Sequence, residues 1–336
     1  MRVIWVLASA LALACAGAAP SRGDERARSD SVSDPDSVSD PDSVSDPDSV
    51  SEPDSVSVTD SDSVTNSVSD PGSVTDSDTD SDTVTDADSD DVATCNAPPE
   101  MACIPAGAFP RGSDREPNER PIETIRVSAF WMDRHEVTNA QYAECVAAGA
   151  CQPAFPYRAF RAPTQPVVAM DWADADAYCR FRDKRLPTEA EWERAARGPV
   201  ATTFPWGEAR PRDCSLANVR DARGPGCGAD TTLPVGSLPA GHFGLFDMAG
   251  NVDEWVADWY APCYRGCEGE CGDACGGDDP RGPCGGASEC DGRRLRVVRG
   301  GSWWWPLEHA TGTYRRGKPP INRVHHRYGF RCAKTP

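Results

Sequence analysis

The hydrophobic and polar positions follow helical spacing in only three segments of the chain. The first spans 139–148 behind Thr138, a cap residue, and the second spans 173–182. The third begins with a capping box, because Thr188 and Glu191 stand three residues apart before an apolar run. A glycine follows the first and third segments, as is common at helix ends. The pattern therefore predicts three short helices.

Strand signals are weaker. β-branched and aromatic residues gather at 122–133 and at 295–299, and Gly300 and Gly301 end the second segment. Helices and strands do not alternate as they do in repeated βα units. The sequence from 95 to 336 therefore predicts an irregular α+β domain with short elements and long loops.

The first 18 residues predict an export signal. Arg2 precedes an apolar run at 3–14 that is too short to cross a bilayer and that ends in small residues. Residues 11–15 resemble the end of a bacterial lipoprotein signal, in which the cysteine, here Cys15, becomes the acylated first residue. Ordinary cleavage after Ala18 is the alternative. We expect an exported protein that is anchored at the outer membrane or cell surface, or else periplasmic or extracellular.

Residues 19–94 predict a disordered acidic linker. The hexapeptide Asp-Ser-Val-Ser-Asp-Pro occurs three times in succession from Asp30, and a fourth copy carries Glu52 instead of the second aspartate. One valine per repeat cannot offset the conformational entropy that is lost when six residues become ordered. This argument rejects the alternative of a stacked repeat structure. We expect the linker to hold the domain away from its anchor.

The charge distribution separates the linker from the domain. The chain carries a formal charge of −19, and residues 22–94, with 22 acidic residues and 3 arginines, account for all of it. Residues 95–336 contain 31 acidic and 30 basic residues. Neither part has the basic excess that binding to nucleic acid or to an anionic membrane surface requires. We therefore expect no nucleic-acid partner, and membrane contact only through the N-terminal lipid anchor.

The 14 cysteines after Cys15 predict disulfides, which are typical of exported proteins. Close spacing pairs Cys145 with Cys151 and Cys214 with Cys227. A glycine-rich insertion at 261–292 holds six more, and we expect three bridges of open connectivity among Cys263, Cys267, Cys271, Cys275, Cys284 and Cys290. A metal site is the alternative, because the first four of these six recur every four residues and zinc binds thiolates at short spacing.

Short sequence blocks follow one another in a fixed order between 101 and 332. The most specific are RLPTEAEWE at 185–193, GL at 244–245, DMAGNV at 247–252, EW at 254–255, RGGS at 299–302 and GFRC at 329–332. Together they resemble the formylglycine-generating, sulfatase-modifying factor domain family. The resemblance implies a fold similar to C-type lectin-like domains, with little regular structure.

The resemblance also implies a disulfide between Cys179 and Cys332, which match a bridged pair in the family. A second family bridge has no counterpart, because Ala196 stands at one of its positions. Closing so long a loop strongly restricts the unfolded chain. We therefore expect the domain to lose much of its stability without this bridge.

Calcium is the cofactor that the resemblance implies. One family cation site aligns with positions that offer carboxylates and backbone carbonyls, namely Asp247, Gly250, Val252 and Glu254. Hard oxygen ligands of this kind suit Ca²⁺. A second family site aligns with Asn218 and the carbonyl of Val219. In the alternative interpretation, the acidic residues only hydrogen-bond loop amides; Asp253, beside the first site, replaces a usual tryptophan.

The positions of the copper ligands decide the expected activity. Family enzymes oxidise a substrate cysteine with O₂ through Cu(I), which two cysteines hold shortly after the Gly-Gly-Ser turn, and this soft ion needs thiolates. Those two positions align with Trp305 and Ala310. We therefore expect neither copper nor catalysis. Formylglycine generation on a sulfatase cysteine is the alternative that the family resemblance offers.

A non-haem iron enzyme is the second alternative, because another family branch holds iron with three histidines. Those histidines come largely from an extra N-terminal helical domain, whereas the N-terminal region here is acidic and contains none. The five histidines stand at 135, 242, 309, 325 and 326, and none forms a metal-spaced pair on a predicted helix. Iron is therefore not expected.

Three consecutive tryptophans follow the Gly-Gly-Ser turn. Trp303, Trp304 and Trp305 cannot all point inward from an extended segment, so at least one should be exposed. With His309 and Arg315 nearby, they predict an aromatic cleft for a peptide or a glycan. The alternative is that the cysteine-rich insertion packs over them. The sequence favours a binding or structural module that meets a protein, peptide or glycan at the cell envelope.

Overall fold

The computed structural model describes residues 97–336. The predicted export signal at 1–18, the lipidation site Cys15 and the linker at 19–94 lie outside the described residues. Among the described helices, none has the length and apolar character that a membrane span requires.

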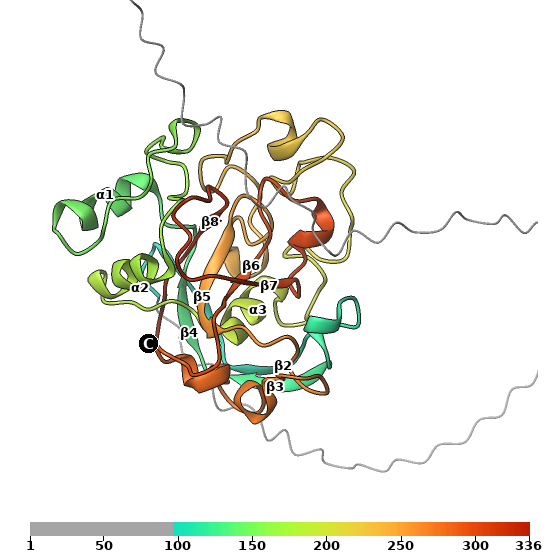
Figure 1. Cartoon of the computed structure of the whole chain (residues 1–336). Helices are drawn as coiled ribbons and strands as arrows, with labels where there is room; N and C mark the ends of the chain where they lie inside the picture. The colour runs from blue at the N-terminus through green and yellow to red at the C-terminus, as the bar shows by residue number, and fades with distance from the viewer. Residues whose placement is uncertain (1–96) are drawn as a thin grey trace, which may run out of the picture. The chain divides into compact units, whose positions relative to one another are not determined.

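Short strands form three separate sheets in the described range (Figure 1). Their bounds are β1 (Met101–Ile104), β2 (Gly107–Arg111), β3 (Glu123–Val127), β4 (Phe130–Asp133), β5 (Asp253–Trp259), β6 (Arg296–Arg299), β7 (Arg315–Lys318), β8 (Tyr328–Gly329) and β9 (Ala333–Lys334). The sheets have the orders β1-β4-β9, β2-β3 and β7-β6-β5-β8. All neighbouring strands are antiparallel except β5 and β8.

The three α-helices form where the sequence predicts them, as α1 (Asn139–Ala147), α2 (Trp172–Phe181) and α3 (Glu189–Arg197). At the start of α3, Thr188 Oγ1 accepts a hydrogen bond from Glu191 N at 3.1 Å, and the Glu191 carboxylate accepts one from Thr188 N at 2.8 Å. The predicted capping box is therefore present. A similar reciprocal pair begins α1 at Thr138.

Single turns of 3-10 helix fill the connections between these elements. They are η3 (Pro117–Glu119), η4 (Arg158–Phe160), η5 (Pro225–Gly228), η6 (His242–Gly244), η7 (Gly272–Cys275), η8 (Pro283–Gly286) and η9 (Leu307–Ala310). With strands of two to seven residues, these turns give the irregular α+β architecture that the sequence predicts.

The strand predictions are less complete than the helix predictions. The segment 122–133 is not one strand, because a break at residues 128–129 separates β3 from β4, and these two strands belong to different sheets. The pattern does not predict β5, although this strand lies in the middle of the largest sheet. Residues on both faces of β5 are buried, so its sequence lacks the polar and apolar alternation of a half-exposed strand.

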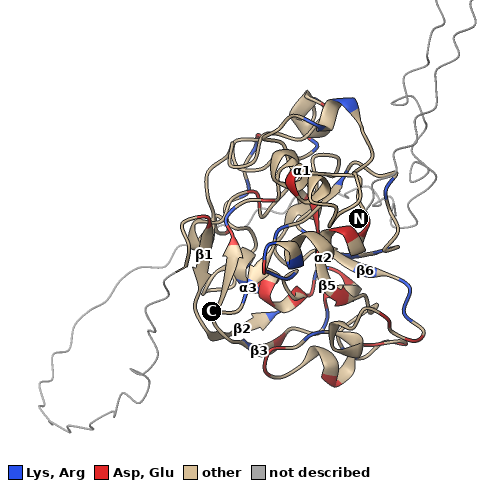
Figure 2. Ribbon diagram, turned by 90° about the vertical axis from the view of Figure 1, so that its left-hand side faces the viewer, with Lys and Arg blue, Asp and Glu red and all other residues tan. Residues whose placement is uncertain are grey.

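Helix α3 lies in the interior of the fold. All nine of its residues are buried, and it contacts β2, β5 and β6. Figure 2 shows its charged positions within the ribbon rather than on the outer loops. The carboxylates of Glu189 and Glu193 are paired with the guanidinium groups of Arg315 and Arg299, each at 2.6 Å. We call these four residues the α3 ion-pair network.

Disulfides fasten the loops. The structure pairs Cys145 with Cys151, Cys214 with Cys227 and Cys179 with Cys332, as predicted. The six cysteines of the insertion pair in sequence order, as Cys263–Cys267, Cys271–Cys275 and Cys284–Cys290. Their sulfurs are therefore bonded to one another and do not form the alternative metal site.

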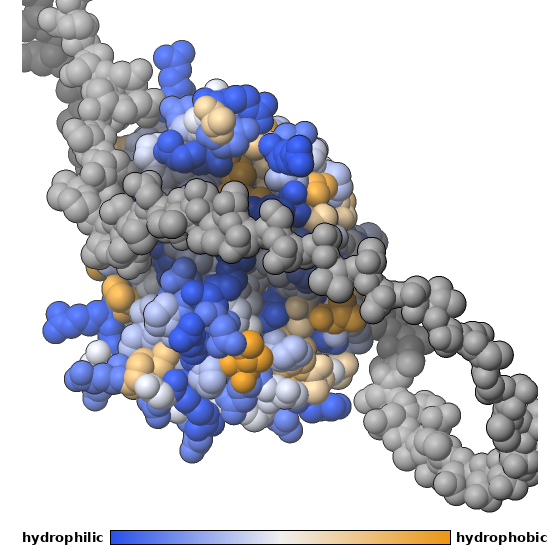
Figure 3. Space-filling model, turned by 90° about the vertical axis from the view of Figure 1, so that its right-hand side faces the viewer, coloured by the Kyte–Doolittle hydropathy of each residue, from blue (hydrophilic) through white to orange (hydrophobic). Residues whose placement is uncertain are grey.

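Apolar side chains on the face shown in Figure 3 are scattered in small patches between polar residues. The large apolar residues that are exposed come from separate segments, namely Ile122, Phe155, Phe181, Val200, Ile321 and Val324. The described residues on that face thus form no broad apolar surface.

Candidate functional site

The two positions that align with the family's copper ligands lie beside the turn that follows β6. Gly301 has φ +68°, and a Cβ atom there would stand 2.4 Å from the carbonyl oxygen of His309, so the turn packs directly against η9. Ala310, the last residue of η9, is completely buried. Trp305 lies between the turn and η9 and is half-buried.

The three tryptophans divide between core and surface, which corrects the predicted cleft. Trp303 is only 1% exposed and packs in an apolar cluster with Phe160 and Val252, so it does not line a cleft. Trp304 and Trp305 are half-buried. The guanidinium of Arg220 lies 4.7 Å from the Trp304 ring centroid.

The prediction that Arg315 lines the cleft is also wrong. It is 1% exposed and donates two hydrogen bonds to the Glu189 carboxylate, at 2.6 and 2.8 Å. Successive residues of a strand point to opposite faces, so the next residue of β7, Arg316, points away from Glu189 and is half-buried. Its guanidinium lies 4.4 Å from the Trp305 ring centroid, and that of Arg327 lies 5.3 Å from the same ring.

These contacts define an aromatic–arginine face, made of Trp304, Trp305, Arg220, Arg316 and Arg327. The His309 ring borders it, 5.2 Å from the Trp305 ring, and stacks on Tyr314 at 4.5 Å. Guanidinium groups over indole rings gain cation–π attraction, and of these arginines Arg220 and Arg316 are half-buried, whereas Arg327 is 1% exposed. The face is therefore suited to a ligand that offers acceptor oxygens.

Asp253 lies beside this face at the start of β5. Its neighbour Glu254 pairs with Arg299 across the sheet, which brings Asp253 close to the turn containing Ser302. Asp253 is 1% exposed, and neither of its carboxylate oxygens has a hydrogen-bond partner with ordinary geometry. The Ser302 hydroxyl, also buried, lies near it without ordinary hydrogen-bond geometry.

Burial raises the pKa of the Asp253 carboxyl above its usual value. The nearby cationic groups of Arg316, Arg327 and Lys318 offset only part of that effect. A buried carboxylate without hydrogen bonds is unfavourable, and such groups occur more often at functional sites than in structural cores. From the sequence, Asp253 was notable only as a replacement of the usual tryptophan.

Thiolates for copper are absent from this part of the structure. Trp305 and Ala310 provide none, and every cysteine of residues 97–336 is disulfide-bonded. The one group of three potential metal ligands that the described residues bring together contains Cys214, Asp221 and Cys227, and its two sulfurs are bonded to each other. The five histidines, all in the described range, form no cluster of three.

The first predicted calcium site is only partly assembled. Glu254 is fully buried, and both of its carboxylate oxygens accept hydrogen bonds, from Arg331 at 2.7 to 3.0 Å and from Trp192 Nε1 at 2.8 Å. The predicted carboxylate ligand is therefore already engaged, in an ion pair rather than in the hydrogen bonds to loop amides that the alternative proposed.

The rest of that site carries an excess of negative charge. Asp247 accepts a hydrogen bond from Gly236 N at 2.7 Å, and burial raises its pKa. Burial and the charges of Asp247 and Glu254 raise the pKa of Glu136 well above its usual value. Glu136 Oε1 is buried without a hydrogen-bond partner. An orphaned carboxylate oxygen beside two more carboxylates fits a bound cation.

The two predicted calcium sites lie next to each other. Asn218 and Gly250 form an isolated β-bridge, and Asn251 N donates to the Asn218 carbonyl at 2.8 Å. The Val219 carbonyl accepts from Cys227 N at 2.9 Å, and Val252 lies in the apolar cluster with Trp303. The bridge and the hydrogen bond therefore place the segment of Asn218 and Val219 against the segment of Gly250 and Asn251.

The chain is similar to known proteins over most of its length. The family model for the sulfatase-modifying factor enzyme 1-like domain matches residues 87–336. The formylglycine-generating enzyme of Thermomonospora curvata is 32% identical over 295 residues, which cover 70% of this chain and 93% of that protein. That of Mycobacterium tuberculosis is 35% identical over 218 residues, 47% of this chain and 73% of the relative.

Other relatives show that the same domain occurs in different proteins. The serine/threonine-protein kinase pkn1 of Chlamydia pneumoniae is 34% identical over 259 residues, and this chain spans 38% of its length. The structure of PvdO from Pseudomonas aeruginosa is 28% identical, with a TM-score of 0.56 and coverage of 70% of this chain and 94% of PvdO. Treponema denticola variable protein 1, at 24% identity and a TM-score of 0.55, supports the fold alone.

The order of the elements, the predicted irregular α+β fold and these similarities agree with one another. The chain therefore belongs to the sulfatase-modifying factor enzyme 1-like family, whose members include the formylglycine-generating enzymes.

Proposed function

We propose that the protein is an exported, surface-tethered binding module that uses the family fold without its copper chemistry. The supporting observation is the state of the two copper-ligand positions. Trp305 stacks with Arg316, and Ala310 is buried against the Gly301 turn. Neither can bind Cu(I), which prefers thiolates, and oxidation of a substrate cysteine by this route requires that ion.

The binding surface in this proposal is the aromatic–arginine face. Trp304 and Trp305 provide apolar area at low entropic cost, and the half-buried guanidinium groups of Arg220 and Arg316 provide positive charge beside the rings. The ligand class is a peptide or glycan of the cell envelope that presents carboxylate or hydroxyl oxygens. Residues of this type at half-buried positions are common among those that dominate binding energies.

The activity alternative is tested by co-expression with a sulfatase that carries the Cys-x-Pro-x-Arg modification motif. Mass spectrometry of the motif peptide should show the unmodified cysteine, both in air and after copper is added. Conversion to formylglycine at a rate above that of cells without the protein would overturn the proposal.

The binding alternative is tested on peptide and glycan arrays with the purified domain. Trp305→Ala should lose at least 10-fold in retention of any ligand found, because a central aromatic contact at an interface is worth about 2 kcal/mol or more. The matched control is Trp131→Ala, which removes a half-buried tryptophan of β4 outside the face. Equal loss in both variants would contradict a role of this face.

Calcium is part of the proposal as a structural ion near Glu136 and Asp247. Bound calcium would offset the negative charge of Glu136 and Asp247 and lower the pKa values of both carboxyl groups. At 100 times the dissociation constant, it should stabilise the fold by about 2.7 kcal/mol. Melting with calcium and with a chelator measures this effect, and Glu136→Gln should reduce it. An unchanged melting temperature in the wild type would contradict the calcium site.

The anchor is tested independently of the binding face. Cys15→Ser should move the protein from the membrane fraction to the soluble fraction, because acylation of that cysteine is the proposed attachment. Retention of the variant in the membrane fraction would contradict a lipid anchor at this position.

A further inference from the structure

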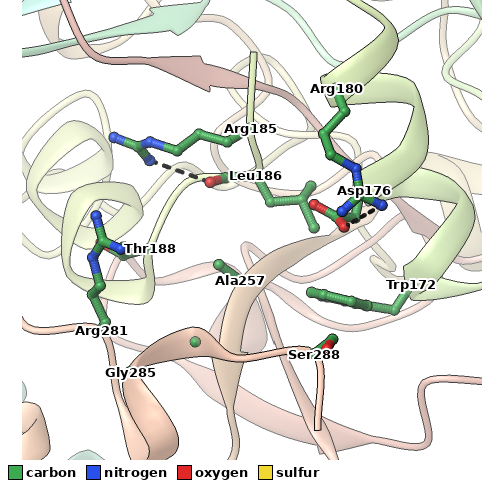
Figure 4. Close-up of a pocket in the computed structure, with 11 residues that line it drawn as sticks. Trp172, Asp176, Arg180, Arg185, Leu186, Thr188, Ala257, Arg281, Gly285 and Ser288 are labelled. Carbon is green, nitrogen blue, oxygen red and sulfur yellow. Dashed lines mark hydrogen bonds and ion pairs between the residues drawn. The ribbon is translucent and has the colours of Figure 1, made fainter. Parts of the chain in front are cut away.

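A cavity of about 340 Å³ lies where the cysteine-rich insertion meets α2 and β5 (Figure 4). The insertion forms one wall with Arg281, Gly285, Gly286 and Ser288. The segment before α3 forms another with Arg185, Leu186 and Thr188, and Trp172, Asp176, Arg180 and Ala257 complete it. None of these residues belongs to the aromatic–arginine face. The volume falls within the range of small-molecule sites.

The two ends of the cavity differ in chemistry. Figure 4 shows Arg185, Arg281 and Thr188 at one end, with the Trp172 ring at the other and Leu186 and Ala257 between them. One end therefore offers guanidinium and hydroxyl donors, the middle offers apolar surface, and the far end combines the Trp172 ring with Ser288 and the Asp176–Arg180 ion pair. Such a gradient suits a ligand with a charged group attached to an apolar body.

Arg281 is the cation at this site without a partner among the described residues. The other two arginines of the cavity are paired, Arg185 with Glu191 at 2.6 Å and Arg180 with Asp176 at 2.9 Å. The nearby Asp279 accepts hydrogen bonds from the backbone and hydroxyl of Ser128, at 2.7 Å each. No hydrogen bond or ion pair joins Arg281 to a residue in the range 97–336, so its guanidinium is available to an anion.

Arg281 also stands at a junction of two hollows. A second cavity of about 210 Å³ shares Arg185, Thr188 and Arg281 with the first. The second cavity is also lined by the carboxylates of Glu191 and Asp279, so an anion at Arg281 is favoured on the side of the first cavity. The guanidinium of Arg281 can donate two parallel hydrogen bonds to an oxyanion, whereas the terminal nitrogens of Arg185 already donate to both carboxylate oxygens of Glu191 at 2.6 Å.

The cavity wall is held in place before any ligand binds. The buried guanidinium of Arg296 lies between the rings of Trp172 and Trp259, 3.6 and 3.7 Å from their centroids. It donates to the carbonyl oxygens of Ala257, Ala287 and Ser288 at 2.6 to 3.0 Å. Arg296 thus joins the insertion to β5 at the cavity floor. A preformed site loses little entropy on binding.

The insertion loop is closed covalently at the same place. The Cys284–Cys290 disulfide spans the residues that provide Gly285, Gly286 and Ser288. Gly285 and Gly286 have φ values of +61° and +74°, so both adopt a backbone conformation that glycine allows without strain. The short side chains along this wall leave the cavity open.

We propose that this cavity is a second binding site, which takes a small ligand with one oxyanion group, such as phosphate or carboxylate, attached to a ring-sized apolar body. The oxyanion contacts Arg281, and the body lies against Leu186, Ala257 and the edge of Trp172. This site goes beyond the proposed binding face and does not depend on it.

Three probes test the proposal by calorimetry on the full chain. Phenyl phosphate carries both groups, inorganic phosphate carries only the oxyanion, and phenol carries only the ring. Phenyl phosphate should bind at least 10-fold more tightly than either of the others. Equal affinity for phenyl phosphate and phosphate would overturn the ring contact, and no binding of phenyl phosphate at 10 mM, roughly the weakest range in which affinity is meaningful, would overturn the site.

Arginine variants locate the binding. Arg281→Gln should weaken phenyl phosphate binding at least 10-fold, since it removes the charge-assisted hydrogen bonds to the oxyanion. Arg281→Lys keeps the charge but not the paired donors, so its affinity for phenyl phosphate should lie between those of the wild type and of Arg281→Gln. Arg294→Gln is the matched control, because Arg294 is an exposed arginine near the end of the insertion that does not line the cavity.

Arg316→Gln separates this site from the aromatic–arginine face. The proposal expects it to leave the affinity for phenyl phosphate unchanged. A loss in Arg316→Gln together with unchanged binding in Arg281→Gln would place the probe on the other face and overturn the proposal. Near-identical melting temperatures for the variants exclude misfolding as the cause of any loss.

Discussion

The interior around α3 and the region around Asp253 bury charge in opposite ways. In the α3 ion-pair network, all four carboxylate oxygens of Glu189 and Glu193 accept hydrogen bonds from arginines. Asp253 is buried to a similar degree, yet neither of its oxygens has an ordinary hydrogen bond. Both regions touch the same sheet, through β6 and β7 on one side and the start of β5 on the other.

The difference separates a buried charge with complete hydrogen bonding from one without it. A buried ion pair with complete hydrogen bonding fixes the geometry of the elements that carry it, and removing one partner is costly. A buried carboxylate without such bonds costs free energy, which the nearby cationic groups of Arg316, Arg327 and Lys318 offset in part at Asp253. Asp253 lies beside the aromatic–arginine face, which is the region that the proposed function needs.

Breaking the α3 ion-pair network should have the largest effect. Arg299→Met leaves Glu193 Oε2 without the guanidinium that lies 2.6 Å away, at a site where both side chains are completely buried. We expect a loss of about 3–5 kcal/mol in the free energy of unfolding, measured by urea denaturation.

The control for this prediction is a surface pair. Arg180→Gln removes an ion pair with Asp176 in which the arginine side chain is 67% exposed. Its cost should stay below about 1 kcal/mol. A loss of similar size in both variants would contradict the assignment of the network as a main determinant of stability.

Loss of the disulfide between Cys179 and Cys332 should have the next largest effect on stability. The bridge joins α2 to the segment in which Arg331 holds Glu254, over a sequence separation of 153 residues. The double variant Cys179→Ala, Cys332→Ala should lose about 2–5 kcal/mol of stability. Thermal melting of the variant beside the reduced and oxidised wild type measures this effect. Unchanged stability would show that non-covalent contacts already fix the C-terminal segment.

A pH titration of stability sharpens the comparison. Asp258 accepts a hydrogen bond from Glu189 N at 2.8 Å, and burial, with the charge of Glu189, raises its pKa to about 7. The folded-state pKa exceeds the unfolded value of about 3.9, so folding favours the protonated form. The contribution of Asp258 to stability is therefore greatest below about pH 4 and is lost as the pH rises towards 7.

Asp258→Asn should flatten this decline, because asparagine keeps the acceptor oxygen and does not ionise. Urea denaturation between pH 4 and 8 provides the measurement. The control is Asp183→Asn, an exposed carboxyl whose pKa is lowered by its hydrogen bond to Lys334, and it should leave the decline unchanged. An identical pH profile for Asp258→Asn and the wild type would contradict the prediction.

The smallest effect is expected at Asp253. Asp253→Asn removes a buried charge that makes no ordinary hydrogen bond, so stability at pH 7 should change by less than about 1 kcal/mol. The same variant should alter ligand binding at the aromatic–arginine face. A loss of about 3 kcal/mol or more would place Asp253 with the α3 ion-pair network as a structural residue.

Local signals were the part of the fold that the sequence could predict. Thr138 and Thr188 mark helix starts because their hydroxyl groups bond amides three residues on. The closely spaced cysteines also paired as expected, because the two members of each pair are near each other in the sequence. β5 escaped prediction because both of its faces are buried, and a strand of that kind has no alternation to detect.

The candidate site was predicted less well than the fold, because its contacts are distant in sequence. Nothing near Glu254 indicates that Arg331, 77 residues later, engages its carboxylate. Which of Arg315 and Arg316 points into the interior depends on strand register, and a shift of one residue reverses the two orientations. The cavity at Arg281 depends on how the insertion folds back onto α2, for which the sequence contains no repeat or motif.

The pairing of the cysteines has a consequence for the order in which the chain can oxidise. Synthesis presents Cys179 long before Cys332, and eight other cysteines come between them. All eight pair with partners 4 to 13 residues away, so each can close as soon as its own loop has emerged. Short loops close much faster than long ones. Among the bridges whose two cysteines both lie in the described residues, the one between Cys179 and Cys332 spans the longest stretch of chain and can therefore form after these shorter ones.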